Sequence, residues 1–438
     1  MKPELGQEIN LSIRNLGIFG EGVGDFEGFT VFVDGALPQE SVKARIYELK
    51  KNYARATLVS CETASVHRVT PPCPVFGRCG GCQLQHLNYE AGLEWKRQRV
   101  IDAFERIGKL KIPVAPCVPS TKPYGYRNKI QLPCLNNKFG LYAFHSHDIV
   151  EIERCLIHCP LGEKASEEVF SLLRRLPLPS LEYLLIKTSE TTEQVLITLV
   201  TQNEGPPQLK EAAEKLLVAM PQIKGIVQNI RKNQSNVILG PTFKTLAGKP
   251  YIEERLCSTR FKISPASFFQ VNPPQAEQLY QTALNLCRLT GSETLFDAYC
   301  GVGTLSLILA PHVKKVIGVD CTAAAISDAK ENATLNGIEN ATFHAAEAES
   351  FINTLSGIDI ALLNPPRKGC DPLFLNKLAS LAPNQIIYIS CDPATLARDL
   401  ALLYTKGYTA EKAQPFDMFP QTVHVETLVL LKGNWLAK

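Results

Sequence analysis

The sequence contains no long hydrophobic run. No stretch of about 18 uncharged apolar residues occurs in its 438 residues, so the sequence predicts no transmembrane helix. The opening segment, MKPELGQEIN, has neither an apolar secretory-type core nor an acid-poor amphipathic pattern. Long internal repeats and low-complexity tracts are also missing. We therefore expect a cytoplasmic protein that makes no membrane contact.

The sequence also lacks a large net charge. Its formal charge of +3 is too small to indicate nucleic-acid binding by itself. The charge is unevenly spread, however, because residues 1–140 carry 19 Lys and Arg against 13 Asp and Glu, and the remainder carries 27 against 30. This favours a basic module that holds a polyanion, joined to a mildly acidic catalytic module. Chance variation among solvated faces is the alternative.

The length predicts two or three domains. Residues 5–62 have Gly-rich turns and short alternating strands, which are typical of a small β-barrel. The stretch VFVDGALPQESVKARI resembles a TRAM domain, an OB-like RNA-binding barrel, so we assign residues 1–65 to it. A barrel used only for packing is the alternative.

The rest of the chain shows two further patterns. Strands and helices alternate irregularly up to about residue 262, which predicts a central α+β domain over 66–87 and 125–262. From about residue 290 a strand, a tight turn and a helix repeat, which predicts a Rossmann-like doubly wound α/β sheet. We assign 88–124 and 263–438 to this C-terminal domain, in which ligands bind at the carboxyl ends of the strands.

A glycine loop in DAYCGVGTLSLILA follows one strand and opens a helix. Gly301 and Gly303 let the backbone approach a ligand closely. A dinucleotide fingerprint needs a third glycine where Ser306 stands. Asp320 ends the next strand, where a carboxylate can accept the hydroxyls of a ribose. The pattern favours S-adenosylmethionine (SAM) over NAD, with a simple packing role for the glycines as the alternative.

A second loop, LLNPPRKG, also ends a strand. Asn-Pro-Pro followed by an aromatic residue is typical of methyltransferases that act on amino groups, because the aromatic ring stacks on the target base. Arg367 occupies that position here, and its guanidinium offers a planar fork for a carbonyl or a phosphate. Asn364 therefore keeps base amino-methylation open without favouring it.

The stretch YISCDPATL places Cys391 where a strand turns into a helix. A thiolate that adds to C6 of uracil makes C5 nucleophilic, and a base must then remove the C5 proton. We expect the N-terminus of the following helix to lower the pKa of Cys391. Glu426, between apolar residues of QTVHVETLVLL, is the candidate base, and its burial would raise its pKa.

Five motifs together resemble the RNA uracil-C5 methyltransferase family, in its ribosomal-RNA branch. They are SPASFFQVNPPQAEQLY, DAYCGVGT, LNPPRKG, ISCDPATLARDL and HVETLVLL. The resemblance implies that Cys391 is the nucleophile and Glu426 the proton acceptor. It implies that the methyl donor is bound at Gln270, Tyr299, Gly301, Gly303, Thr304, Asp320 and Asn364. The family usually has Asp at position 364 and often Asn at position 304, so donor binding or base contact can differ here.

Three cysteines stand close together in PPCPVFGRCGGCQLQH, as Cys73-x5-Cys79-x2-Cys82. Iron–sulfur members of the family have this spacing and a distant fourth cysteine after a strand like IVEIE, which implies Cys155, with Cys159 as the alternative. Four thiolates suit a [4Fe-4S] cluster or structural zinc, and the lone fourth cysteine favours the cluster. Free thiols are the remaining alternative.

Two other features are candidate RNA contacts. Phe268 and Phe269 precede Gln270 and would stack on a base or lie in the core. The helix expected after residue 88 carries a basic face, which would touch phosphates or simply be exposed. That face consists of Lys96, Arg97, Arg99 and Arg106.

These expectations combine into one hypothesis, which is SAM-dependent methylation of C5 of a uridine in RNA through a Cys–C6 adduct. The favoured substrate is 23S ribosomal RNA, ahead of transfer RNA. Amino-methylation and a non-catalytic RNA-binding assembly factor are the alternatives, and a cytosine-C5 enzyme would need a Pro-Cys pair that the strand-end loops lack. We infer no protein partner and expect a monomer.

Overall fold

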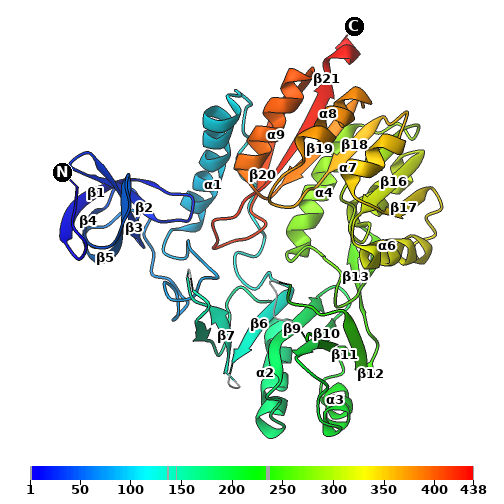
Figure 1. The fold of residues 1–438 in the computed structure, drawn as a ribbon, viewed down its shortest axis with the longest axis horizontal. Coiled ribbons are helices and arrows are strands. Elements are labelled where there is room, and N and C mark those ends of the chain that lie inside the picture. Colours follow the sequence, from blue (N-terminus) through cyan, green and yellow to red (C-terminus); the bar gives the residue numbers. More distant parts are fainter. Residues whose placement is uncertain (1, 136–137, 145, 233–236, 438) are drawn as a thin grey trace.

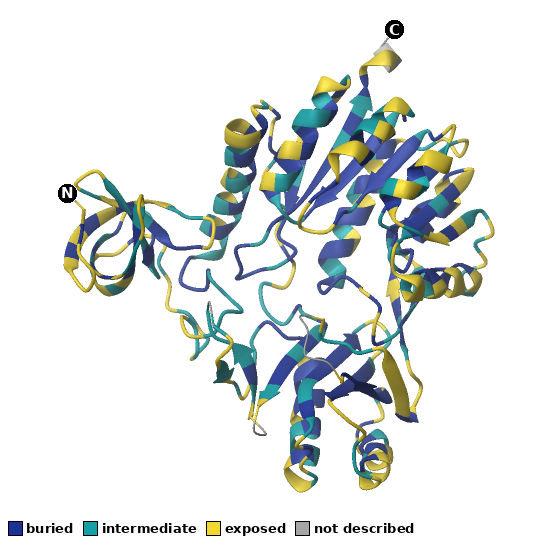
Figure 2. Ribbon diagram, viewed as in Figure 1, coloured by how far each residue is buried: buried dark blue, intermediate teal, exposed yellow. Residues whose placement is uncertain are grey.

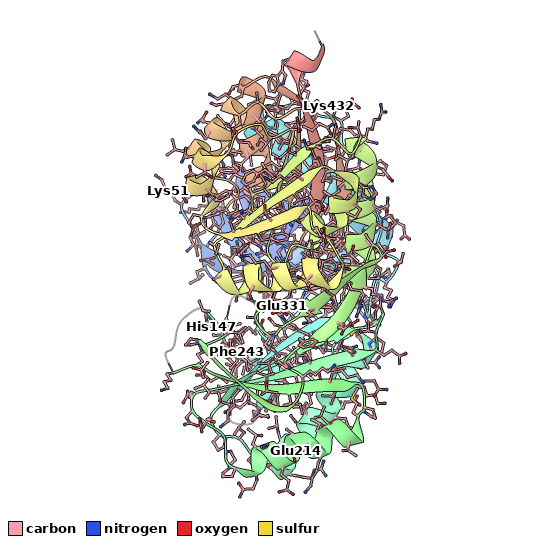
Figure 3. All side chains as sticks on the ribbon, turned by 90° about the vertical axis from the view of Figure 1, so that its right-hand side faces the viewer. Lys51, His147, Glu214, Phe243, Glu331 and Lys432 are labelled. Atoms are coloured by element: carbon pink, nitrogen blue, oxygen red, sulfur yellow. The ribbon has the colours of Figure 1, made fainter. Side chains whose placement is uncertain are left out.

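The computed structural model describes residues 2–135, 138–144, 146–232 and 237–437. Figure 1 shows a small N-terminal barrel beside a larger body, in which a C-terminal sheet lies above a central sheet. The view turned by 90° repeats this order, with Lys432 near the top and Glu214 near the bottom (Figure 3). Within the described ranges, none of the helices is both long and apolar enough to cross a membrane. The domain boundaries given above remain predictions.

The N-terminal strands close into a barrel in the order β1-β2-β3-β5-β4. Buried and exposed residues alternate along β1, so that Ile9, Leu11 and Ile13 fill the barrel. The strands are β1 (Glu8–Leu16), β2 (Gly22–Phe26), β3 (Phe29–Asp34), β4 (Ser41–Leu49) and β5 (Tyr53–Thr63). The expected N-terminal barrel is thus confirmed.

The central sheet has the strand order β12-β11-β10-β9-β6-β7-β8, and its neighbours are antiparallel except for β10 and β11. Figure 2 shows its helices turning exposed faces outward. The strands are β6 (Lys129–Leu135), β7 (Lys138–Tyr142), β8 (Ile149–Glu151), β9 (Leu181–Ser189), β10 (Gln194–Thr201), β11 (Ile223–Ile230) and β12 (Thr242–Gly248). The helices are α2 (Pro160–Arg175) and α3 (Gln208–Ala219), and a ribbon of β13 (Ile252–Leu256) and β14 (Thr259–Ile263) follows.

The C-terminal sheet has the order β17-β16-β15-β18-β19-β21-β20, in which β21 is antiparallel to both neighbours. Its strands are β15 (Thr294–Asp297), β16 (Lys315–Asp320), β17 (Ala341–Ala345), β18 (Ile360–Leu363), β19 (Gln385–Ser390), β20 (Tyr408–Phe416) and β21 (Glu426–Gly433). Its helices are α4 (Pro273–Cys287), α5 (Thr304–Leu309), α6 (Ala323–Leu335), α7 (Ala348–Phe351), α8 (Pro372–Ser380) and α9 (Pro393–Thr405), with 3-10 turns at Ala310–His312, Ile352–Thr354 and Asn434–Ala437. The predicted doubly wound sheet is confirmed.

Helices cover both faces of this sheet because its strands are apolar on both sides. Leu295 faces a core shared with α4, α5 and α6, and the next residue, Phe296, faces a core shared with α1, α8 and α9. This arrangement leaves the carboxyl ends of the parallel strands as the accessible edge, where ligands of such sheets bind.

A segment from early in the chain completes the sheet. Helix α1 (Tyr89–Ala103), continued by a π-helix (Phe104–Gly108), packs on α9 and β20. It begins at Asn88, whose side chain accepts a hydrogen bond from the Ala91 amide at 2.9 Å. Beyond it, Val114 and Val118 form parallel bridges to β20.

The structure contradicts the expectation of a phosphate-facing basic edge on α1. Lys96 is buried and pairs with the equally buried Asp417 at 2.5 Å. Arg99 donates to the carbonyl of Val423, and Arg97 donates to the carbonyl of Val114 at 3.0 Å. These cations hold the helix against the C-terminal domain. Of the four, Arg106 at the far end extends into solvent, with a side chain that is 75% exposed.

Candidate active site

Cys391 lies in the turn between β19 and α9. The turn is held by Asp392, whose carboxylate caps α9 by accepting hydrogen bonds from the amides of Ala394 (2.9 Å) and Thr395 (3.0 Å). The thiol is half-buried at the carboxyl end of a central strand. It is therefore fixed in position and still within reach of a ligand.

Glu426 is the first residue of β21, which lies between β19 and β20 rather than at an edge. The register of β19 and β21 pairs Ser390 with Thr427, so the next pair along brings Cys391 beside Glu426. Glu426 is only 4% exposed. Antiparallel strand pairing thus joins the two predicted reactive residues, which are 35 positions apart in the sequence.

Burial of this pair favours the protonated form of both groups. Burial raises the pKa of Glu426 to about 8, and the Arg367 guanidinium opposes part of that rise. Burial, and then the Glu426 carboxylate, raise the pKa of Cys391 to about 11, against Arg367. Burial and the neighbouring carboxylates therefore outweigh the lowering of the Cys391 pKa that we expected from the helix N-terminus. Asp392, which caps that terminus, is itself an anion that raises the Cys391 pKa.

Arg367 connects the loop after β18 to this pair. Its guanidinium lies 3.2 Å from Nε2 of His424, and its carbonyl accepts a hydrogen bond from the Thr395 hydroxyl at 3.2 Å. Burial and Arg367 lower the pKa of His424 to about 4, so this imidazole is neutral at neutral pH. Sequence reasoning missed His424, although the motif HVE places it two residues before Glu426.

Asp399 of α9 holds the same loop against this helix. Its buried carboxylate accepts hydrogen bonds from the amide of Cys370 (2.8 Å) and the hydroxyl of Tyr388 (2.5 Å). A Cβ on Gly369, where φ is +74°, would come within 2.6 Å of that carboxylate. The loop 364–370 is therefore locked onto α9. Sequence reasoning missed Asp399. Its position on the apolar face of a predicted helix, with Leu396 and Leu400, is the signal that could have found it.

The glycine loop is held by two carboxylates. Asp297 accepts a hydrogen bond from the hydroxyl of Ser306 at 2.5 Å, and Asp320 accepts one from the amide of Gly301 at 3.1 Å. Gly301 has a φ of +54°, and an added Cβ would meet open space. The serine that replaces the third glycine of a dinucleotide site thus ties α5 to the preceding strand, and the backbone at Gly301 is free to approach a ligand.

The structure places most other predicted donor residues around that loop. Tyr299 lies in the turn between β15 and α5, and Thr304 is the first residue of α5. Asn364 follows the neighbouring strand, β18. Gln270 comes from the segment before α4, is 8% exposed, and its carbonyl accepts a hydrogen bond from Asn128 at 3.2 Å. Its side chain is the hydrogen-bond partner of Tyr280, which in turn lies near Glu426.

The two phenylalanines before Gln270 have different environments. Phe269 is 7% exposed and packs against Phe261, with ring centroids 5.7 Å apart. Phe268 is 67% exposed. Only Phe268 remains available to a base.

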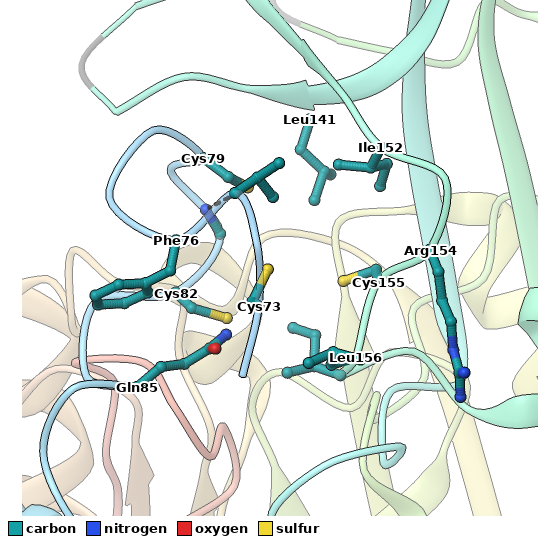
Figure 4. A pocket seen from close by; sticks show the side chains of 13 residues that line it. Cys73, Phe76, Cys79, Cys82, Gln85, Leu141, Ile152, Arg154, Cys155 and Leu156 are labelled. Atoms are coloured by element: carbon teal, nitrogen blue, oxygen red, sulfur yellow. Dashed lines mark hydrogen bonds between the residues drawn. The ribbon is translucent and has the colours of Figure 1, made fainter. Parts of the chain in front are cut away.

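The four predicted cluster ligands line one pocket (Figure 4). Cys73, Cys79 and Cys82 come from the loop before α1, and Cys155 comes from the segment after β8. Apolar side chains such as Leu141 and Ile152 line the same pocket. Within the described ranges no group of three or more His, Cys, Asp or Glu side chains is placed to hold a metal ion. Cys159 is separate, because its thiol contacts the Thr188 hydroxyl at 3.0 Å.

Backbone hydrogen bonds connect the cysteine loop to the segment 417–425 between β20 and β21. The amides of Gln83 and Leu84, which directly follow Cys82, both donate to the carbonyl of Gln421 at 3.0 Å. The side chain of Gln83 accepts from the amide of Val423 at 3.4 Å. The segment that leads into Glu426 therefore rests on the cysteine loop.

Comparison with known proteins identifies a family for each end of the chain, in agreement with the resemblances found in the sequence. A family described as tRNA (Uracil-5-)-methyltransferase matches residues 172–434, and the TRAM domain matches residues 2–59. An uncharacterized RNA methyltransferase of Listeria monocytogenes is 42% identical over 445 residues, covering 98% of each chain. One of Staphylococcus aureus is 42% identical over 430 residues, covering 94% of this chain and 95% of its own.

A solved structure is similar along almost the whole length. The crystal structure of Pyrococcus abyssi tRNA (uracil-54, C5)-methyltransferase in complex with S-adenosyl-L-homocysteine has a TM-score of 0.78 and 28% sequence identity, covering 97% of this chain and 100% of its own. The C-terminal sheet therefore has the fold of SAM-dependent methyltransferases, and the barrel is a TRAM domain. This chain belongs to the tRNA (uracil-5-)-methyltransferase family and is a SAM-dependent RNA methyltransferase.

Proposed function

We propose that this enzyme methylates C5 of a uridine in 23S ribosomal RNA through a covalent bond between Cys391 and C6 of the base. The observation that carries the proposal is the β19–β21 register, which sets a half-buried thiol beside a buried carboxyl group. Both lie at the carboxyl edge of the sheet that holds the glycine loop.

Cys391 supplies the nucleophile. Its thiolate adds to C6 and breaks the conjugation of the ring, so that C5 becomes an enolate carbon. SAM supplies an electrophilic methyl group on a sulfonium. When C5 bonds to that methyl carbon, the carbon–sulfur bond of the donor breaks and its electron pair stays on sulfur. Arg367 is the nearby cation that favours the thiolate before addition.

Glu426 removes the remaining C5 proton. Its carboxylate accepts that proton, the electrons of the C5–H bond re-form the C5–C6 double bond, and the Cys391 thiolate leaves. A carboxyl group with a pKa near 8 is well suited to this step, because the best acid–base groups have pKa values close to the working pH. The positive charge of a bound donor shifts Glu426 and Cys391 toward their anionic forms.

The glycine loop and its neighbours would hold the methyl donor. Asp320 already accepts the Gly301 and Thr322 amides, so its carboxylate is oriented at the strand end to accept ribose hydroxyls as well. Asn364 in place of the usual Asp keeps a hydrogen-bonding oxygen but carries no charge. The proposed donor-binding residues are Gln270, Tyr299, Gly301, Gly303, Thr304, Asp320 and Asn364.

The cysteine pocket would hold a [4Fe-4S] cluster on Cys73, Cys79, Cys82 and Cys155. The ligands of one tetrahedral zinc ion have sulfur atoms about 3.8 Å apart. In a cluster each thiolate binds a different iron atom, so the sulfurs lie farther apart. The four cysteines line one pocket, and the lone fourth cysteine, far from the other three in the sequence, favours the cluster over zinc. Its role would be structural, since the loop supports the segment before Glu426.

Transfer RNA is the second candidate substrate. The P. abyssi protein, similar over almost the whole chain, is a tRNA methyltransferase by name. The arrangement of the cysteines favours ribosomal RNA, because it resembles that of the ribosomal-RNA branch.

The reaction class can be tested with RNA that contains 5-fluorouridine. Fluorine cannot leave as a proton does, so the enzyme should remain covalently attached after methyl transfer from labelled SAM. A complex that survives denaturing electrophoresis with the wild-type protein, and is lost in Cys391→Ser, is the expected result. Cys61→Ser, at a partly exposed thiol on β5 of the barrel, is the matched control. Full methylation by Cys391→Ala would instead point to amino-methylation through Asn364.

The substrate can be tested in parallel. Mapping of 5-methyluridine in RNA from a strain that lacks the gene should show one missing position in 23S ribosomal RNA. Loss confined to transfer RNA would overturn the ribosomal assignment, and no missing position in either RNA would overturn the proposed methylation of C5 of uridine.

A further inference from the structure

Lys187, in β9 of the central sheet, is a buried cation whose partners are backbone carbonyls. It is 7% exposed, and its ammonium donates to the carbonyls of Ser264 at 2.8 Å and Ser267 at 2.6 Å. Burial, and then Lys129 of the neighbouring strand β6, lower the pKa of Lys187 to about 7, against the Asp328 carboxylate. Removing an ammonium from water costs free energy unless it is well hydrogen-bonded. These two bonds therefore tie Lys187 firmly to the short turn that contains both serines.

The same turn is also fastened to α6 by Asp328. The Asp328 carboxylate accepts hydrogen bonds from the hydroxyls of Ser264 (3.0 Å) and Ser267. The Ser264 amide donates to the Ser267 hydroxyl at 3.0 Å, which closes the turn. The serine side chains thus bind the C-terminal domain, while their carbonyls bind the central domain. An ammonium suits two neighbouring carbonyls, because it carries three N–H donors and no acceptor.

Asn128, which directly precedes β6, holds the other end of this segment. It is 6% exposed, and its side-chain amide donates to the carbonyl of Gln270 at 3.2 Å. Asn128 lies close to Lys187, because its carbonyl accepts the amide of Thr188, the next residue of β9, at 2.9 Å. In Figure 1 the central sheet lies below α4, the helix that follows the segment. The central sheet thus holds the segment 264–270 at both ends.

This support matters because of where Gln270 lies. The other proposed donor-binding residues belong to turns and helix starts next to strands of the C-terminal sheet, so strand pairing sets their positions. The segment 264–270 contains neither helix nor strand, and no strand ladder fixes it. Its position relative to the glycine loop therefore depends on its hydrogen bonds to Lys187, Asn128 and Asp328.

We propose that Lys187 is a positioning residue for the methyl donor. By holding the carbonyls of Ser264 and Ser267, it fixes the segment that presents Gln270 to SAM. The central domain then contributes to donor affinity from outside the donor site. This inference rests on the donor-binding role of Gln270 in the proposed function.

Calorimetric titration of the full-length protein with SAM, without RNA, tests the inference in a double-mutant cycle. Lys187→Met removes the charge and both hydrogen bonds, so it should weaken SAM binding roughly tenfold. Because Lys187 acts through Gln270, the same substitution should change the affinity of Gln270→Ala by less than about twofold. Wild-type affinity in Lys187→Met would overturn the inference. A full further loss in the Gln270→Ala background would overturn it as well.

Two further variants make the test specific. Lys187→Gln keeps a polar side chain if methionine prevents folding, and its shorter, uncharged amide should lose the same affinity. Lys262→Met is the matched control, because Lys262 lies two positions before the turn and pairs instead with Glu331 of α6 at 3.1 Å. It should bind SAM like the wild type, since such partly exposed pairs contribute little. An equal loss in this control would show a general effect of charge and remove the role assigned to Lys187.

A kinetic readout separates the inference from the proposed reaction. With saturating SAM, Lys187→Met should reach nearly the wild-type kcat and form the trapped complex with 5-fluorouridine RNA, while its KM for SAM rises roughly tenfold. A lowered kcat with an unchanged KM would refute the inference alone. Wild-type SAM affinity in Gln270→Ala would refute both the donor role of Gln270 and the inference. A wild-type protein that forms no trapped complex would refute the proposed methylation, and the binding cycle would still decide the role of Lys187.

Discussion

The buried carboxyl group of Glu426 should make the protein less stable as the pH rises. Its pKa is about 8 in the folded protein against 4.5 ordinarily. The folded state therefore holds its proton more tightly than the unfolded chain does. The stability that this proton contributes is fully present below pH 4.5 and is lost as the pH rises through 8, to a limit of about 5 kcal/mol.

Replacing Glu426 with Gln removes the titration and keeps the size of the side chain. Between pH 5 and pH 9 the wild type should lose about 4 kcal/mol that Glu426→Gln retains. For a domain of this size that corresponds to roughly 8–16 °C in Tm. If the amide changes the free energy of unfolding by a constant amount, that amount cancels, because only the dependence on pH is compared. The titration of Asp297, whose pKa is raised to about 7, also cancels, because it occurs in both proteins.

The measurement is thermal unfolding of both proteins across this pH range at one scan rate. Glu411→Gln is the matched control, because Glu411 is 81% exposed and pairs with Lys432 at the surface. The Tm of the control should follow that of the wild type. Parallel curves for wild type and Glu426→Gln would refute the proposed burial of an ionisable base and the pKa argument for catalysis.

Three further predictions concern the surrounding parts. Lys96→Met should cost about 3–5 kcal/mol of unfolding free energy in denaturant titrations, because it leaves Asp417 buried and unpaired, and Lys96→Met/Asp417→Leu should recover most of it. Anaerobically purified Cys155→Ser should lose bound iron and sulfide in chemical analysis, whereas Cys159→Ser should keep both. Asp320→Asn should weaken SAM binding roughly tenfold in calorimetry, since the neutral amide accepts hydroxyls less strongly, and unchanged binding would place the donor elsewhere.

The parts of the fold that local sequence patterns specify could be predicted. The alternation in β1, the glycine loop before α5 and the turn at Cys391 each depend on neighbours within a few positions. The sequence motifs predicted Glu426 as a reactive residue, but they did not show how it comes to lie beside the thiol of Cys391. That meeting depends on β21 entering the sheet antiparallel between β19 and β20, which no local periodicity reveals.

Predictions that required long-range contacts failed for a physical reason. Lys96 and Arg99 have the spacing of an exposed basic face, yet their partners lie more than 300 positions away. The pKa of Cys391 was likewise misjudged, because the helix N-terminus is a local feature, whereas burial and Glu426 are tertiary ones. Asp399 and His424 each carry a sequence signal, but that both contact the loop 364–370 is visible only once the loop is folded.

The segment 417–425 connects the N-terminal parts of the chain to the C-terminal sheet. Lys96 of α1 holds its start, the cysteine loop holds Gln421, and Gly20 of the barrel packs on Val423. Glu426 follows directly, and a buried carboxyl group that destabilises the fold once it is ionised needs such support to stay beside Cys391. Contacts from the barrel, the cysteine loop and α1 therefore converge on the nine residues that precede the proposed base. A change in the cysteine loop or in the barrel should reach the reaction through this segment, without touching the reacting atoms.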